Sequence, residues 1–159
     1  MLFYCESLTS YKRLKTREVS IGDLLLGNFH PIRIQTMTTT DTMDTLATVE
    51  QTIRCIEAGA ELVRITGPSK KEAENLLNIK NELHRRGYTT PLVADIHFTP
   101  NAAEIEARIV EKVRVNPGNI KEFDGRVAEV AKAAAAAGIP IRIGVNAGSL
   151  GKRFMEKDG

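Results

Sequence analysis

The sequence predicts an α/β protein of the TIM-type (β/α) barrel class, a partial barrel with about five of the eight β/α units of a complete one. Three observations predict this class. Short aliphatic segments alternate with segments of helical period along most of the chain. The connections between them are short, as in a parallel sheet with helices outside. Each strand segment alternates aliphatic with polar residues, whereas strands of a doubly wound sheet tend to be apolar on both faces.

Composition limits the classes of function. The chain has 159 residues, 42% of them hydrophobic and 26% charged, as in one ordinary globular domain. A net charge of +2, no tryptophan and 5% aromatic residues argue against a nucleic-acid partner. No apolar run is long enough to predict a membrane span. Cys5 and Cys55 lie far apart in the sequence, and we interpret them as free thiols in a reducing cytoplasm.

The beginning of the chain is predicted to be a separate feature. Residues 1–16 show no period and are expected to form an irregular arm, and residues 17–159 the partial barrel. Residues 17–21 and 24–26 flank Gly22 and Asp23, which predicts a small hairpin able to cap one end of the barrel.

Each predicted helix has a start signal or a stop signal. The first begins after Asp44, carries Leu46, Val49, Ile53 and Ile56 on one face, and ends at Gly59. The second begins with the capping-box spacing of Ser69 and Glu72 and ends at Gly87. The third begins at Thr99 and Pro100 and ends near Ile109. The fourth covers residues 124–137, before Gly138, and residues 152–159 are expected to begin a fifth. The strands between them are predicted at residues 31–37, 62–66, 91–97, 113–116 and 139–146.

Three predicted strands share one pattern, an arginine between two aliphatic residues. These arginines are Arg64, Arg114 and Arg142, and residues 32–35 hold a weaker copy around Arg33. In a parallel sheet such side chains converge near the carboxyl ends of the strands, where TIM-type barrels place their active sites. Grouped guanidinium groups repel one another unless an anion lies among them, and their planar forks fit phosphate oxygens. For Arg33 we expect only a half-exposed side chain or an ion pair.

Other polar residues are expected at the same strand ends. Gln35, Asn116 and Asn146 offer neutral donors and acceptors suited to hydroxyl groups. Asp95 is able to orient a donor or pair with an arginine. His97 is suited to proton transfer, although a hydrogen-bonded rim histidine is an equally good interpretation. The set predicts a small ligand with more than one phosphate group and some hydroxyl character.

Long motifs in this sequence resemble a known family. They are residues 34–38, 63–66, 91–98, 113–119 and 141–150, which include VADIHF, VRVNPGN and IRIGVNAGSL. In order and spacing they are similar to those of the 4-hydroxy-3-methylbut-2-enyl diphosphate synthase family. The resemblance implies a TIM-type barrel that binds 2-C-methyl-D-erythritol 2,4-cyclodiphosphate and opens its ring reductively in isoprenoid biosynthesis. It implies diphosphate binding by Arg64, Arg114, Asn116, Arg142 and Asn146, with Gln35, Asp95 and His97 at the strand ends.

The same resemblance implies features outside these residues. It implies a [4Fe–4S] cluster, ferredoxin or flavodoxin as reductant, and a homodimer when the chain is full length. The family's cluster ligands lie in a C-terminal domain that this sequence does not include, so we expect the chain alone to be inactive and marginally stable or associating. Residues up to 98 resemble the longer family form, and those after Asn119 the short bacterial form. Two alternatives stay open: a non-catalytic anion-binding or assembly module, and a pterin-binding-type barrel.

Overall fold

The computed structural model describes residues 7, 9–10, 14–96, 100–119, 125–146 and 148. Five strands form one parallel sheet in chain order: β3 (Gln35–Met37), β4 (Leu62–Gly67), β5 (Leu92–Ile96), β6 (Lys112–Val115) and β7 (Ile141–Ile143). Four helices connect them: α1 (Thr45–Glu57), α2 (Lys70–Arg85), α3 (Pro100–Ala107) and α4 (Arg126–Ala137). The strand order never reverses, which distinguishes this sheet from a doubly wound one.

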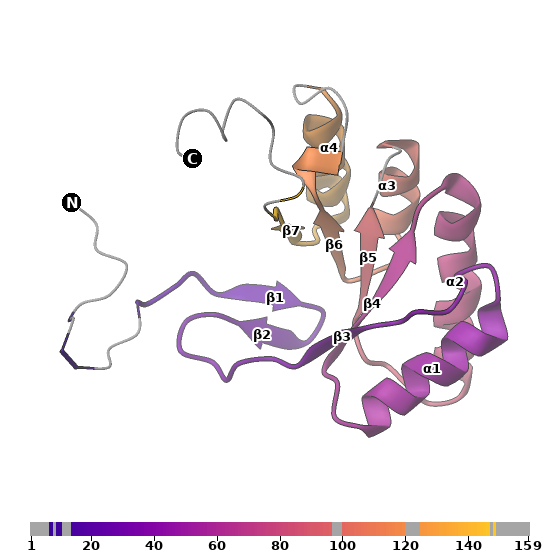
Figure 1. Cartoon of the computed structure of the whole chain (residues 1–159), viewed down its shortest axis with the longest axis horizontal. Helices are drawn as coiled ribbons and strands as arrows, with labels where there is room; N and C mark the ends of the chain where they lie inside the picture. Colours follow the sequence, from indigo (N-terminus) through magenta and orange to yellow (C-terminus); the bar gives the residue numbers. More distant parts are fainter. Residues whose placement is uncertain are drawn as a thin grey trace.

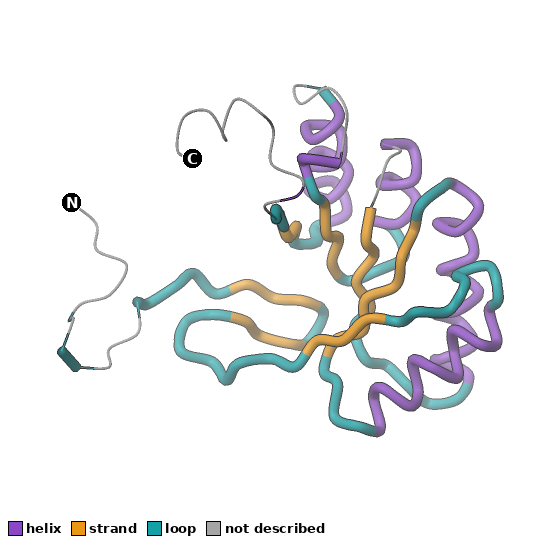
Figure 2. Tube along the Cα trace, in the orientation of Figure 1, coloured by secondary structure: helices purple, strands orange, loops and turns teal. Residues whose placement is uncertain are grey.

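The helices lie together on one side of the sheet, and the hairpin projects from the other (Figures 1 and 2). A hydrogen bond shows how strongly the sheet curves. The Nζ atom of Lys112 on β6 donates to Oε1 of Gln35 on β3, at 2.8 Å, although two strands separate β3 from β6. The sheet is therefore a trough with its hollow side away from the helices, as the partial-barrel prediction requires.

The main core fills the space between the sheet and the helices. Val63, Ile65, Leu92, Ala94 and Ile96 point toward the helices and are buried there. The intervening residues of β4 and β5 point into the trough. The predicted division between an aliphatic helix-facing side and a polar hollow side is thus confirmed.

A hairpin closes the amino-terminal end of the trough. Its strands are β1 (Val19–Ile21) and β2 (Leu24–Leu26), paired antiparallel around Gly22. Ile21 is fully buried against Leu62 and Val93, and these three residues form an apolar floor. The prediction of a hairpin that caps one end of the barrel is confirmed.

The expected helix boundaries are largely observed. An oxygen of Asp44 accepts from the backbone N–H of Ala47 at 3.0 Å, which caps α1. Ser69 caps α2, since its hydroxyl oxygen accepts from the backbone N–H of Lys71 at 3.3 Å, and its O–H donates to Glu72, the other residue of the predicted capping box. Gly138 follows α4 with φ of 69°, a left-handed conformation that glycine adopts without strain.

Several expected boundaries and faces were wrong. Residues 31–34 do not belong to a strand, because the Ile34 N–H donates to the carboxylate of Glu61, and Ile32 and Ile34 are exposed. Leu46 is also exposed, because the buried face of α1 consists of Thr48, Val49, Thr52 and Ile53. β7 is shorter than residues 139–146, and α3 ends at Ala107 rather than near Ile109. The predictions for Thr99, for residues 152–159 and for most of the arm lie outside the described residues.

Candidate functional site

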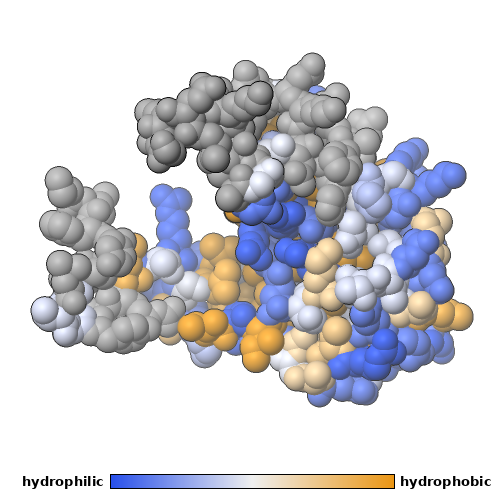
Figure 3. All heavy atoms as spheres, viewed as in Figure 1, coloured by the Kyte–Doolittle hydropathy of each residue, from blue (hydrophilic) through white to orange (hydrophobic). Residues whose placement is uncertain are grey.

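The candidate site lies at the carboxyl ends of β4 to β7, in the trough. The register places Thr66, Asp95, Arg114 and Arg142 beside one another on four successive strands. Because neighbouring parallel strands lie about 4.8 Å apart, their side chains share one surface. Hydrophilic residues gather in the middle of the molecule, beside the hydrophobic residues of the hairpin (Figure 3).

Asp95 lies between two of the three arginines. Its Oδ1 accepts from Nη1 of Arg114 at 2.9 Å, and its Oδ2 lies 3.5 Å from Nε of Arg64. The Asp95 side chain is only 3% exposed, so each guanidinium group offsets the cost of burying its charge. Asp95 therefore holds the two arginines at a common point.

Arg114 is fixed from a second side. Its Nη2 donates to the backbone carbonyl of Gly144 at 3.1 Å, and its buried Nε has no hydrogen-bond partner among the described residues. A Cβ atom at position 144 would lie 3.0 Å from that Nε, so the absence of a side chain there leaves room for the guanidinium group. A buried donor without a partner costs free energy, and a ligand acceptor is one means of satisfying it.

Arg64 and Arg142 are held less tightly. The Nε and Nη2 atoms of Arg64 lie 3.3 and 3.0 Å from the Met37 sulfur, a weak acceptor. Arg142 pairs in register with Arg114 and is exposed on β7. It nevertheless acts on the pKa of Lys112, so it contributes to the same electrostatic field. The trough therefore holds all three arginines, Arg64, Arg114 and Arg142, and Arg142 is the one most open to solvent.

Gln35 and Lys112 form the deepest polar pair of the trough, and sequence reasoning missed Lys112. Lys112 is 6% exposed although it carries an ammonium group. Burial, together with the positive charges of Arg142 and Arg64, lowers its pKa to about 8. The available signal was its position two residues before Arg114, which puts both side chains on one face of the strand.

The two asparagines differ in their surroundings. Asn116 is 2% exposed, and its Oδ1 accepts from the N–H of Gly118 at 3.1 Å, which shapes the turn after β6. Asn146 is exposed near Gly148. Asn116 therefore supports the strand end, in addition to any contact with a ligand, while Asn146 lies open on the rim.

Two further residues were interpreted from the sequence, His97 and Arg33. His97 lies outside the described residues. Arg33 forms the expected ion pair, since its Nη1 lies 2.8 Å from Oε1 of Glu61. His30, between the hairpin and β3, contacts the carboxylate of Glu18 at 2.7 Å.

Glu106 is a buried acid that the sequence reasoning did not single out. It is 0% exposed on α3, and among the described residues neither of its carboxyl oxygens has a hydrogen-bond partner. Burial, together with the negative charge of Asp95, raises its pKa to about 9. Its Oε1 lies against Gly67, where a Cβ atom would approach it to 1.6 Å. Glu106 is therefore a neutral acid behind the trough at neutral pH.

The described residues do not fit an iron–sulfur cluster. Among them no group of three or more histidine, cysteine or acidic residues is placed to hold a metal ion. Cys55 is a free thiol on α1, packed against the main core, and the only other cysteine in the sequence is Cys5.

In the part of the chain that the structure describes, no helix has the length and apolarity needed to span a membrane.

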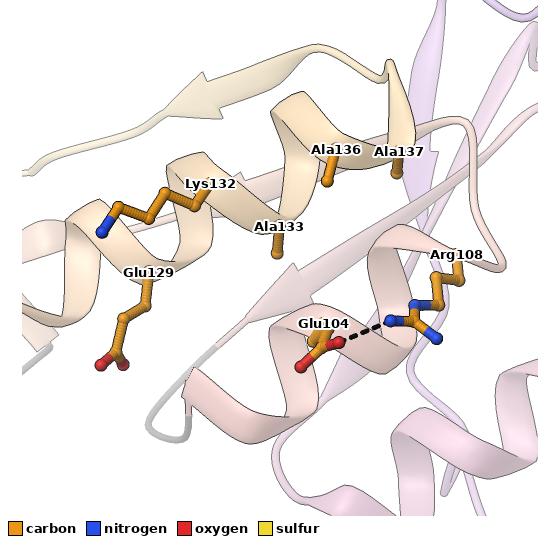
Figure 4. Close-up of a pocket in the computed structure, with 7 residues that line it drawn as sticks. All are labelled: Glu104, Arg108, Glu129, Lys132, Ala133, Ala136 and Ala137. Carbon is orange, nitrogen blue, oxygen red and sulfur yellow. Dashed lines mark hydrogen bonds and ion pairs between the residues drawn. The ribbon is translucent and has the colours of Figure 1, made fainter.

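A surface groove between α3 and α4 is separate from this site. Glu104 and Arg108 line it from α3 and form an ion pair, and Glu129, Lys132 and three alanines line it from α4 (Figure 4). Both helices lie on the outer side of the sheet (Figure 1). The groove shows no convergence of charge like that in the trough, so the trough is the better candidate for function.

The fold defines the class: five consecutive parallel strands, joined by four helices on one side of a curved sheet, form a TIM-type partial barrel. Residues 16–159 match the family model described as the GcpE TIM-barrel domain, and the chain belongs to that family. The resemblance inferred from the sequence motifs is thereby confirmed.

Curated relatives and solved structures agree with this assignment. The chain is 51% identical over 149 residues to the 4-hydroxy-3-methylbut-2-en-1-yl diphosphate synthase (flavodoxin) of Nocardia farcinica. It is 52% identical to the protein of the same name from Mycobacterium tuberculosis. In both cases the match covers 92% of this chain and 37% of the relative, so the chain spans about a third of the length of these relatives. The 7,8-dihydropteroate synthase of Vibrio fischeri superposes with a TM-score of 0.59 at 17% identity, over 79% of this chain and 48% of that one. At this identity the likeness shows the fold alone.

Proposed function

We propose that this chain is the substrate-binding part of a 4-hydroxy-3-methylbut-2-enyl diphosphate synthase, with 2-C-methyl-D-erythritol 2,4-cyclodiphosphate as its ligand. The single observation that carries the proposal is the excess of positive charge in the trough. Arg64, Lys112, Arg114 and Arg142 face one described carboxylate, Asp95. An anion with two phosphate groups offsets that excess, and guanidinium forks suit its oxygens.

The proposed roles follow from position. Arg64, Arg114 and Arg142 bind the phosphates, and the free Nε of Arg114 is one available donor. Gln35, Asn116 and Asn146 contact hydroxyl or bridging oxygens around the rim. Asp95 orients two of the arginines, and His97 transfers a proton near the strand ends. In this proposal residues 1–16 are an arm and residues 17–159 the barrel portion.

We assign the reductive step to groups other than the described residues, among which no set of side chains is placed to hold a metal ion. A [4Fe–4S] cluster supplies electrons in the proposed whole enzyme, with flavodoxin or ferredoxin as its reductant, in a cytoplasmic homodimer. Two cysteines are too few for a cluster held by several thiolates. We therefore expect the chain alone to bind the cyclodiphosphate without reducing it. Turnover by the 159-residue chain with a chemical reductant would contradict this expectation.

Calorimetric titration of the cyclodiphosphate tests the binding proposal. We expect Arg64→Ala and Arg114→Ala to weaken binding by about tenfold or more each, since each removes a charged hydrogen-bonding group. Arg108→Ala is the matched control, because it removes an exposed arginine on the outer side of α3. Equal affinities for the wild type and all three variants would overturn the proposal, as would no binding by the wild type.

Neither alternative has an observation that favours it over this proposal. The superposition on dihydropteroate synthases supports the fold assignment, and it gives no support for a pterin ligand. A non-catalytic anion-binding module uses the same arginines, and the family membership makes the synthase the simpler proposal.

A further inference from the structure

Lys112 occupies an unusual position for a charged side chain. It lies one inward-facing position below Arg114 on β6, in register with Val93. Val93 belongs to the apolar floor with Ile21 and Leu62. The ammonium group therefore lies between that floor and the guanidinium groups, where the interior of a TIM-type barrel normally holds branched aliphatic side chains.

The ammonium group is poorly compensated there. Among the described residues its one hydrogen bond goes to the neutral Oε1 of Gln35, and it forms no ion pair. An ammonium group has three N–H donors, so Lys112 is able to donate to further acceptors. The charges that lower its pKa are those of Arg142 and Arg64, both positive. A buried cation among other cations lowers the stability of the protein unless an anion joins it.

We propose that Lys112 is a further anion-binding residue of this site, the deepest of its cations, and that its ammonium group donates to a phosphate oxygen of the bound diphosphate. The inference rests on the proposed function and deepens it. The charged groups on the same face are Arg64 on β4, Asp95 on β5, Arg114 on β6 and Arg142 on β7.

Proton uptake on ligand binding distinguishes this role from a purely structural one, in which Lys112 only joins β6 to β3 through its hydrogen bond to Gln35. A pKa of about 8 leaves part of the Lys112 population neutral at mildly alkaline pH. A phosphate oxygen beside Lys112 favours the charged form, so binding takes up a proton in that range. A clamp that only curves the sheet takes up no proton when the ligand binds.

The test is calorimetric titration of the cyclodiphosphate into the 159-residue chain at about pH 7 and about pH 9.5, in buffers of different ionisation enthalpy. Each phosphorus of this cyclic diphosphate carries a single, strongly acidic O–H group, so the ligand does not titrate there. We expect Lys112→Met to weaken binding at pH 7 by about tenfold and to abolish the proton uptake, and Lys112→Arg to stay within about threefold of the wild type. Lys80→Met is the matched control, since it removes a partly buried lysine that pairs with Glu111 outside the trough.

The outcomes separate the two proposals. In one outcome Arg114→Ala loses binding, whereas Lys112→Met keeps both the affinity and the proton uptake of the wild type. That outcome overturns the inference about Lys112 and leaves the proposed arginine site in place. If neither variant changes the affinity, or the wild type does not bind, the proposed function falls and this inference with it. If Lys112→Met does not fold, the wild type decides, because a pH-independent affinity without proton uptake overturns the inference.

Discussion

Arg114 on β6 donates to Asp95 on β5 at 2.9 Å, and the two residues are direct partners in the register of the sheet. The same carboxylate lies 3.5 Å from Arg64 on β4. One acid therefore holds two arginines from different strands. The arrangement supports an anion site in which Asp95 presents the guanidinium groups and the ligand offsets the remaining charge.

Asp95→Asn removes the negative charge from this arrangement and leaves the shape nearly unchanged. We expect a loss of about 2–3 kcal/mol in the free energy of unfolding, because two poorly exposed guanidinium groups lose their counterion. Added inorganic phosphate is expected to restore part of the loss by binding to them. Urea denaturation with and without phosphate measures both effects. Wild-type stability, or a loss on which phosphate has no effect, would contradict this account of Asp95.

Gly144→Ala tests whether the close approach of Arg114 matters for binding. The new Cβ lies 3.0 Å from Nε and 3.2 Å from Nη2 of Arg114, so the flexible end of that side chain has to move. We expect the affinity for the cyclodiphosphate to fall by about fivefold, with less than about 1 kcal/mol lost from stability. Gly125→Ala is the control, since nothing lies within 4 Å of a Cβ at that position. An unchanged affinity for Gly144→Ala would show that Arg114 need not hold this position.

Glu106 predicts a specific pH dependence of stability. Its pKa of about 9 in the folded state lies above the ordinary value of 4.5, so the folded state binds more protons than the unfolded state between these values. Stability therefore falls as pH rises through this range, by up to about 4 kcal/mol between pH 5 and pH 8. Glu106→Gln is expected to remove most of this slope in urea denaturation. A wild-type slope that persists in the variant would assign the effect to other groups.

The strands and helices were largely predictable because local signals agree with the tertiary structure. Asp44, Ser69 and Gly138 mark helix ends through their own hydrogen bonds or backbone conformation. The arginines of β4, β6 and β7 were found because an alternating pattern fixes the face on which a side chain lies. The strand expected at residues 31–37 lacks its first part, residues 31–34, because the backbone N–H of Ile34 donates to the side chain of Glu61 and not to a neighbouring strand.

The rest of the site depends on contacts that no local pattern contains. Lys112 is significant because β3 curves around to meet β6, and only the folded sheet brings Gln35 to it. Glu106 resembles an ordinary charged helix residue in the sequence, and its burial against Gly67 appears only in three dimensions. The anion needed among the arginines was expected to be a ligand, and the structure shows that Asp95 already supplies part of it.

The open edge of the sheet predicts association. Ile143 on β7 is 63% exposed, and β7 is the last of the described strands in the sheet. Because exposed apolar residues at the edge of the described sheet favour pairing with another chain, we expect the sedimentation coefficient to rise with protein concentration. Ile143→Lys is expected to reduce this rise, and Leu77→Lys, on the exposed side of α2, is the control. A wild type that sediments as one monomer and melts cooperatively would refute this prediction.

The most direct test of the central claim is a titration of the cyclodiphosphate followed by NMR of the arginine Nε–H groups. Arg64, Arg114 and Arg142 lie on three strands and are predicted to shift together with one dissociation constant. Arg33 and Arg85, which pair with Glu61 and Glu82 outside the trough, are predicted to stay unchanged. Shifts at Arg33 or Arg85 in place of the three trough arginines, or no shifts at all, would contradict the claim that these three form one diphosphate site.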